Sequence, residues 1–156
     1  DRVEFMLSAN PGESLKPLEK VASGGEMSRI MLAFKAIAAN ADSIPTLIFD
    51  EIDTGISGHI AAVVGEKMVS IADNHQVLCV THLPQIAALA DVHFMVQKQD
   101  DGQTTRTSLK RLEMEERYEY IARMMSGMED SKLAYEHARE LITHSEEIKQ
   151  KRRKNK

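Results

Sequence analysis

The sequence has few of the features that mark secreted, membrane-spanning or phosphate-loop proteins. Its single cysteine, Cys79, excludes an internal disulfide, and its 156 residues include no tryptophan. No apolar run approaches the ~18 residues that suggest a membrane-spanning helix. None of the eight glycines is followed by lysine, so the phosphate-loop pattern ending in Gly-Lys-Ser/Thr has no match. With 42% hydrophobic and 28% charged residues, the composition predicts a soluble globular domain without a membrane partner.

The net charge of −4 hides an uneven distribution. Six of the last eight residues are basic, and without them 14 basic residues face 24 acidic ones, a net charge of −10. We therefore separate an acidic body, residues 1–148, from a basic tail, residues 149–156. The tail is interpreted either as a solvated helix end or as a contact to nucleic acid, and the composition leaves both open.

Apolar spacing predicts alternating helices and strands in the body. A helix should start near Gly24, followed by a strand at Thr46–Phe49, a helix from about Ser57 and a strand at residues 77–80. Apolar runs without polar alternation are typical of parallel strands covered on both faces. The predicted inner faces of the two helices are Met27, Ile30, Met31, Phe34, Ile37, Ala38 and Ala41, and then Ile60, Val63, Val64, Met68 and Ile71.

Shorter elements are predicted at both ends of the chain. Residues 3–9 should form a strand that leads into a loop at residues 10–13. A short helix at 83–89 should precede a hairpin with strands at 92–98 and 104–112, which turns at Asp101-Gly102. The last forty residues should be helical with a break near Gly127, and their predicted apolar side is Leu133, Ala134, Ala138, Leu141 and Ile142.

Ser23-Gly24-Gly25-Glu26, at the start of the first long helix, has two interpretations. Ser-x-x-Glu is a capping box, which satisfies the first backbone N–H groups of a helix. A cap does not need two glycines, however, and their bare N–H groups beside a serine hydroxyl suit a phosphate. The interpretations are compatible, because a capped helix can still present its amides.

Both apolar strands end in reactive side chains, Asp50-Glu51 on the first and Thr81-His82 on the second. Functional residues of parallel sheets collect at the carboxyl ends of the strands. Phosphoryl transfer to water needs magnesium and a carboxylate that orients or deprotonates the water, and Asp50 and Glu51 fit these tasks in turn. Asp53 adds a third acid, and an imidazole at His82 can hydrogen-bond a terminal phosphate.

Together these residues resemble the ABC ATPase superfamily. The tetrapeptide from Ser23 to Glu26 matches the signature motif, residues 47–51 the Walker B strand, Asp53 the D-loop, and Thr81-His82 the switch histidine. A glutamate ending the signature, and Glu51-Ile52-Asp53, resemble the SMC-related branch more than the membrane transporters. Residues 50–58 and 81–87 are similar to the RecN family of bacterial DNA-repair ATPases, and the resemblance covers nearly the whole chain.

The resemblance implies an α/β fold: a partial ABC-ATPase head with parallel central strands flanked by helices, a C-terminal hairpin and terminal helices. In that superfamily two heads sandwich two ATP molecules. Ser23, Gly24 and Gly25 would contact the γ-phosphate bound to the second head of a homodimer, and Glu26 and Asp53 would lie at the nucleotide site. On the head's own nucleotide, the implied roles are magnesium support for Asp50, catalytic base for Glu51 and γ-phosphate contact for His82.

The implied function is ATP hydrolysis in DNA double-strand-break repair and recombination, by a cytoplasmic protein that joins the nucleoid during repair. The Walker A loop, Q-loop and coiled coil of such proteins are not in this chain, so we expect them upstream and expect the chain alone to be inactive. Three alternatives remain at this stage: a nucleotide-binding subunit of an ABC transporter, a metal-dependent nuclease or phosphatase with an acid cluster, and a non-catalytic interaction module.

Overall fold

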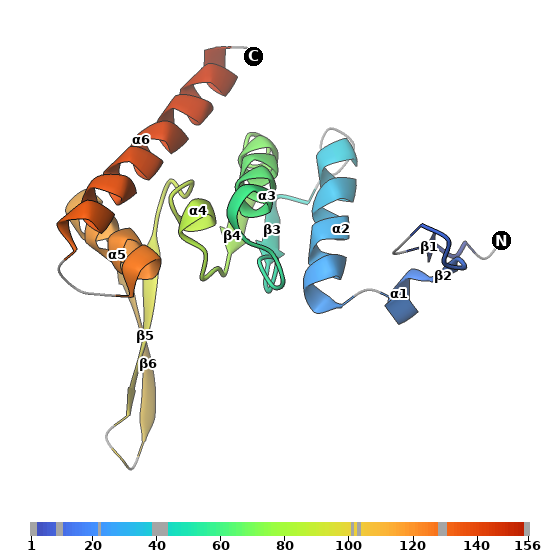
Figure 1. Cartoon of the computed structure of the whole chain (residues 1–156), viewed down its shortest axis with the longest axis horizontal. Helices are drawn as coiled ribbons and strands as arrows, with labels where there is room; N and C mark the ends of the chain where they lie inside the picture. The colour runs from blue at the N-terminus through green and yellow to red at the C-terminus, as the bar shows by residue number, and fades with distance from the viewer. Residues whose placement is uncertain are drawn as a thin grey trace. The chain divides into compact units, whose positions relative to one another are not determined.

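The computed structural model describes residues 3–8, 11–21, 23–38, 44–100, 102, 104–127 and 131–154. They form two compact units, which we call unit 1 (Asp1–Ile56 and Ser70–Thr81) and unit 2 (Ser57–Val69 and His82–Lys156). The elements in chain order are drawn in Figure 1: β1 (Met6–Leu7), β2 (Lys16–Pro17), α1 (Leu18–Val21), α2 (Gly24–Ala38), β3 (Thr46–Phe49), α3 (Gly58–Ile71), β4 (Gln76–Cys79), α4 (Pro84–Ala87), β5 (Phe94–Asp100), β6 (Thr105–Arg111), α5 (Met114–Ser126) and α6 (Lys132–Lys154).

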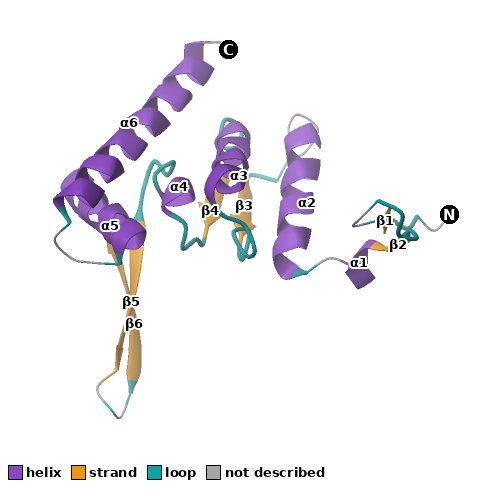
Figure 2. Ribbon diagram, viewed as in Figure 1, coloured by secondary structure: helices purple, strands orange, loops and turns teal. Residues whose placement is uncertain are grey.

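Unit 1 contains the parallel strand pair that the sequence predicts. β3 and β4 pair in parallel with Ile48 opposite Leu78, and they form one of three two-stranded sheets among the described residues (Figure 2). The N–H of Val80 donates to the carbonyl of Phe49 at 3.0 Å, which extends the pairing toward the carboxyl ends of both strands. This places the segments after Phe49 and after Cys79 at the same edge.

The sequence predicted that both faces of this strand pair are covered, and for the described residues this prediction is wrong. Leu47 and Phe49 are buried, whereas Ile48 is 71% exposed and its neighbour Leu78 is also exposed. Side chains alternate between the faces of a strand, so one face of β3 has a layer packed on it and the other has none among the described residues. An apolar run can predict a strand, but it does not show how many faces the surrounding chain covers.

Helix α2 begins at Gly24 as predicted, but its predicted buried stripe is largely wrong. Leu32 is buried, whereas Met31 and Phe34 are exposed and Ile37 is 85% exposed. The buried residues of α2, Gly25 and Leu32, are not part of the predicted stripe and lie on the opposite side of the helix. Ala41, also part of the prediction, lies outside the described residues.

The N-terminal strand is shorter than predicted. β1 covers only Met6–Leu7 and pairs antiparallel with β2, an element that the sequence did not predict. The N–H of Leu18 donates to the carbonyl of Phe5 at 2.9 Å, which ties the start of α1 to this small sheet. Ala9 and Asn10, part of the predicted strand and loop, lie outside the described residues.

Unit 2 has a helical core formed by α5 and α6, which lie side by side (Figure 1). The buried cluster comprises Ala88, Ile121, Ala122, Ala134, Ala138 and Ile142. The predicted break is confirmed: Gly127 has a left-handed φ of 68° and its N–H donates to the carbonyl of Arg123 at 2.8 Å. The predicted apolar side of α6 holds for Ala134, Ala138 and Ile142 but is wrong for Leu133, which is exposed.

The predicted hairpin is confirmed as β5 paired antiparallel with β6, with Val96 opposite Leu109. Gly102 of its turn has a φ of 81°, while Asp101 lies outside the described residues. Helix α3 is confirmed, but two residues of its predicted inner face, Ile60 and Val63, are exposed. No helix in the described ranges is both long and apolar enough to cross a membrane.

Helix α6 continues through Lys154, into the segment predicted as a basic tail. Lys149 is only 5% exposed, and its Nζ lies 3.0 Å from a carboxylate oxygen of Asp91 and 2.9 Å from one of Glu146. This lysine therefore anchors α6 to the loop before β5. Lys151, Arg153 and Lys154 are exposed on the same helix.

Candidate active site

The candidate site begins at the capped N-terminus of α2. The backbone N–H of Ser23 donates to Oε2 of Glu26 at 2.8 Å, and the N–H of Glu26 donates back to Oγ of Ser23 at 3.4 Å. These bonds, the one from the Ser23 backbone first, hold the pKa of Glu26 below its usual value. The capping interpretation is confirmed, because both bonds of the box are present.

The two glycines that follow allow α2 to approach the end of β3. A Cβ at Gly24 would lie 2.7 Å from Oε2 of Glu51, and a Cβ at Gly25 would lie 2.9 Å from the carbonyl oxygen of Glu51 and 3.0 Å from Cβ of Thr54. Real Cβ atoms are not found under 3.0 Å from such neighbours. Close packing against the backbone of Glu51 therefore requires glycine at position 25, whereas at position 24 only the flexible end of the Glu51 side chain lies in the way. The start of α2 and the end of β3 form one surface.

Glu51 adopts an unusual backbone conformation at this junction. Its φ of 56° is left-handed, a region that costs a non-glycine residue of order 1 kcal/mol. Its N–H donates to Oδ1 of Asp50 at 2.9 Å, and its carbonyl accepts from the N–H of Thr54 at 3.1 Å. The turn leaves the side chains of Asp50 and Glu51 exposed just beyond β3, where a carboxylate can reach a ligand or a water.

Asp53 does not share this exposure. It is 3% exposed, and its Oδ2 accepts a 2.6 Å hydrogen bond from Oγ1 of Thr81. The bond ties the turn after β3 to the segment after β4. Asp53 therefore has a structural role, because it holds these two segments together. Its position beside a nucleotide stays a prediction.

Neither a zinc site nor an acid cluster is evident in the part of the chain that the structure describes. That part contains no group of three or more His, Cys, Asp and Glu side chains placed to hold a metal ion. Burial, with smaller contributions from Asp53 and Asp50, raises the pKa of Cys79 to about 12. The thiol therefore stays protonated near neutral pH and is a poor nucleophile.

His82 belongs to unit 2, in which its side chain is exposed. It follows Thr81 directly in the chain, and Thr81 is held by Asp53 in unit 1. The expected convergence of His82 with Glu51 on one nucleotide stays a prediction.

Sequence reasoning missed Ser28 and Arg29, which join α2 to the turn. Oγ of Ser28 donates to the carbonyl of Asp50 at 2.9 Å, and Nη1 of Arg29 donates to the carbonyls of Ile52 at 3.1 Å and Thr54 at 2.8 Å. Helical spacing gave a signal: the two residues follow Gly24 and Gly25 by four positions and so share their face of α2.

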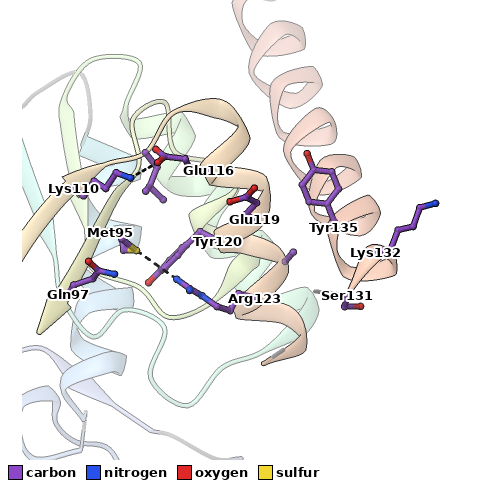
Figure 3. Close-up of a pocket in the computed structure, with 12 residues that line it drawn as sticks. Met95, Gln97, Lys110, Glu116, Glu119, Tyr120, Arg123, Ser131, Lys132 and Tyr135 are labelled. Atoms are coloured by element: carbon purple, nitrogen blue, oxygen red, sulfur yellow. Dashed lines mark hydrogen bonds and ion pairs between the residues drawn. The ribbon is translucent and has the colours of Figure 1, made fainter. Parts of the chain in front are cut away.

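A cavity of about 610 Å³ lies elsewhere, between the hairpin and the helices α5 and α6 of unit 2 (Figure 3). None of the predicted site residues lines it. Three of its charged side chains interact with other lining residues: Lys110 pairs with Glu116, and the guanidinium of Arg123 lies 5.0 Å from the ring centre of Tyr120. The lining selects no class of ligand, so the candidate site remains the junction of α2 and β3.

The chain is similar in sequence to bacterial proteins of known name. No family model matches. "DNA repair protein RecN" of Halalkalibacterium halodurans is 51% identical over 149 residues, 96% of this chain and 26% of that protein. The RecN proteins of Bacillus subtilis and Xylella fastidiosa are 47% and 45% identical over 96% and 95% of the chain. The chain is homologous to the C-terminal part of RecN.

The chain spans about a quarter of the length of these RecN relatives. A solved structure described as "Structural biochemistry of ATP-driven dimerization and DNA stimulated activation of SMC ATPases" matches with a TM-score of 0.48 and 20% identity, covering 78% of this chain and 80% of that one. The similarity to RecN rests on the sequence relatives alone. They do not favour a transporter subunit or an independent acid-cluster hydrolase.

Proposed function

We propose that the full-length protein containing this chain hydrolyses ATP to ADP and phosphate and acts in DNA double-strand-break repair and recombination. The observation that carries the proposal is the packing of Gly24 and Gly25 against Glu51. It places a helix N-terminus suited to phosphate beside an exposed carboxylate suited to activating water, and the proposal assigns these two groups to the two nucleotides of a dimer. The printed names of the RecN relatives, as DNA repair proteins, support the biological setting.

In this proposal the start of α2 serves the nucleotide held by the second head of a homodimer. Backbone N–H groups of Gly24 and Gly25 and the hydroxyl of Ser23 donate to the γ-phosphate, and the positive end of the helix dipole favours its charge. Glu26 keeps Ser23 in place through the capping box. These donors are preorganised, so they need no rearrangement as charge develops in the transition state.

Glu51 and His82 serve the head's own nucleotide. The carboxylate of Glu51 orients the attacking water and accepts its proton as the oxygen attacks the γ-phosphorus. The imidazole of His82 donates a hydrogen bond to a γ-phosphate oxygen. Asp53 holds the turn that carries Glu51 through its bond from Thr81.

The donor set at the end of β3 fits a supporting role toward Mg²⁺. Asp50 offers an exposed carboxylate beside that of Glu51, and carboxylates are ligands that magnesium accepts directly or through water. Magnesium would neutralise charge on the phosphates. The remaining ligands, with the phosphate loop and its lysine, would come from other parts of the full-length protein, which would also contact DNA and work in the cytoplasm at the nucleoid.

The proposal is tested by Glu51→Gln in the full-length protein. Removal of a general base is expected to lower kcat by at least about 100-fold, while ATP binding remains. The matched control is Glu136→Gln, which neutralises an exposed glutamate on α6 and should leave kcat unchanged. Near-normal steady-state hydrolysis in Glu51→Gln would remove Glu51 from its role.

A further inference from the structure

One contact in unit 1 is required neither by the helix cap nor by the proposed chemistry. A single nitrogen of Arg29, Nη1, donates to the carbonyls of both Ile52 and Thr54, at 3.1 and 2.8 Å. These carbonyls belong to the turn that follows Glu51. Hydrogen bonds from a charged donor are shorter and stronger than those from neutral groups, so this guanidinium fixes the path of the turn.

Two further contacts connect α2 to the same turn. Oγ of Ser28 donates to the carbonyl of Asp50 at 2.9 Å. On the other side Gly25 has no room for a Cβ, which would lie 3.1 Å from Nη1 of Arg29 as well as against Glu51. The first two turns of α2 and residues 50–54 therefore form one block with a backbone that is bonded or packed at each step.

We propose that Arg29 is a positioning residue that makes the N-terminal turn of α2 and the turn carrying Glu51 move together. The inference rests on the proposed function, in which Ser23, Gly24 and Gly25 serve the second head's nucleotide and Glu51 serves its own. A shift of α2 on engaging one γ-phosphate then resets the carboxylate at the other. Arg29 thereby links the two ATP sites of the dimer.

The test uses the full-length protein with Arg29→Met, which keeps the apolar stem and removes the donors, and Arg29→Lys, which keeps a cationic nitrogen. In Arg29→Met we expect kcat to fall between about 10- and 100-fold, as for a misplaced catalytic group. KM for ATP should stay within about two-fold. The Hill coefficient for ATP, about 2 when two sites are coupled, should fall toward about 1. Arg29→Lys should recover most of both losses.

Hydrogen exchange of the peptide covering residues 50–57 gives a second readout. ATP should protect this peptide in the wild type and in Arg29→Lys but not in Arg29→Met. Lys98→Met, which removes an exposed cation from β5, is the control and should behave as wild type.

A folded Arg29→Met variant with wild-type kcat, Hill coefficient and exchange would overturn the proposal, as would a lower Tm with those three values unchanged. If Arg29→Met does not fold, Arg29→Gln, which has a shorter neutral donor, takes its place under the same criteria. Absence of ATP hydrolysis in the wild-type protein would refute the proposed function itself, and this inference with it, so the two failures are distinguishable.

Discussion

The strand pair β3–β4 and the helix pair α5–α6 differ in how far their apolar side chains are buried. On the strand pair, Ile48, Leu78 and Val80 are all exposed. On the helix pair, Ile121 is 0% exposed and Ile142 is almost as deeply buried. The helix pair thus has a core of its own, whereas the strand pair buries only one of its faces within the described chain.

The difference matters because the candidate site lies at the end of the less protected pair. Glu51 is the second residue after β3, and a two-stranded sheet is at best marginally stable without further packing. In our proposal, other parts of the full-length protein would supply that packing together with the phosphate loop. A site supported in this way would become rigid only when the rest of the head is in place.

The largest expected difference in unfolding free energy is between a fully buried isoleucine of the helix pair and an exposed isoleucine of the strand pair. Ile121→Ala removes a fully buried side chain and should cost about 2–5 kcal/mol of unfolding free energy. Ile48→Ala removes an exposed one and should change it by about 0.5 kcal/mol or less. Urea unfolding of the chain measures both.

The same substitution in the full-length protein sharpens the comparison. If other parts of that protein cover β3, Ile48→Ala should there cost at least about 2 kcal/mol. An equally neutral result in the chain and in the full-length protein would show that this face stays uncovered.

The next prediction compares the loss of stability when each glycine of the junction between α2 and β3 is replaced by alanine. Gly25→Ala places a Cβ against the backbone oxygen of Glu51 and should cost about 1–3 kcal/mol. Gly24→Ala meets only the flexible end of the Glu51 side chain, which can move aside, so its cost should be at most about 0.5 kcal/mol. Equal losses in thermal unfolding would contradict the packing described for Gly25.

A smaller effect tests the anchor of α6. Lys149→Met removes the ion pairs to Asp91 and Glu146 but keeps the apolar stem. Both partners are partly solvated and can rehydrate, so we expect a loss of about 1 kcal/mol. Lys151→Met, at an exposed position of the same helix, should stay within about 0.5 kcal/mol. Equal effects would mean that Lys149 belongs energetically with the solvated cations.

The smallest effect is a pH dependence in unit 2. Burial and the nearby Arg117 hold the pKa of His93 below its usual value. The unfolded chain therefore takes up a proton more readily, so the stabilising contribution is complete above about pH 6.5 and is lost as the pH falls toward the folded pKa. His93→Phe should flatten the dependence of Tm on pH in this range, and His137→Phe, at an exposed position, should not. An unchanged slope in His93→Phe would contradict this account.

The sequence predicted an element correctly where a cap, a turn residue or an apolar period within the segment determines it. The start of α2 at Gly24, the strand at Thr46–Phe49, the hairpin and the break at Gly127 all follow from caps, periodicity and turn residues. The burial of Ile37 and Ile48 was predicted wrongly, because burial depends on which other segments pack there. Periodicity reports only that a face is apolar.

The site shows the same division. The sequence identified Asp50 and Glu51 as strand-end carboxylates, and the structure places them beside the capped helix. The burial of Asp53 and the bridge from Arg29 depend on backbone carbonyls that become neighbours only after folding. Neither can be predicted from residue type, because the positions of backbone carbonyls depend on the path of the folded chain.

We propose that this chain carries the hydrolytic carboxylate and the trans phosphate donors, and that the phosphate loop comes from another part of the full-length protein. ATP hydrolysis, measured with magnesium side by side for the chain alone and for the full-length protein, tests this division of the site. We expect hydrolysis by the full-length protein and none above the buffer blank by the chain. Robust magnesium-dependent hydrolysis by the purified chain would contradict it.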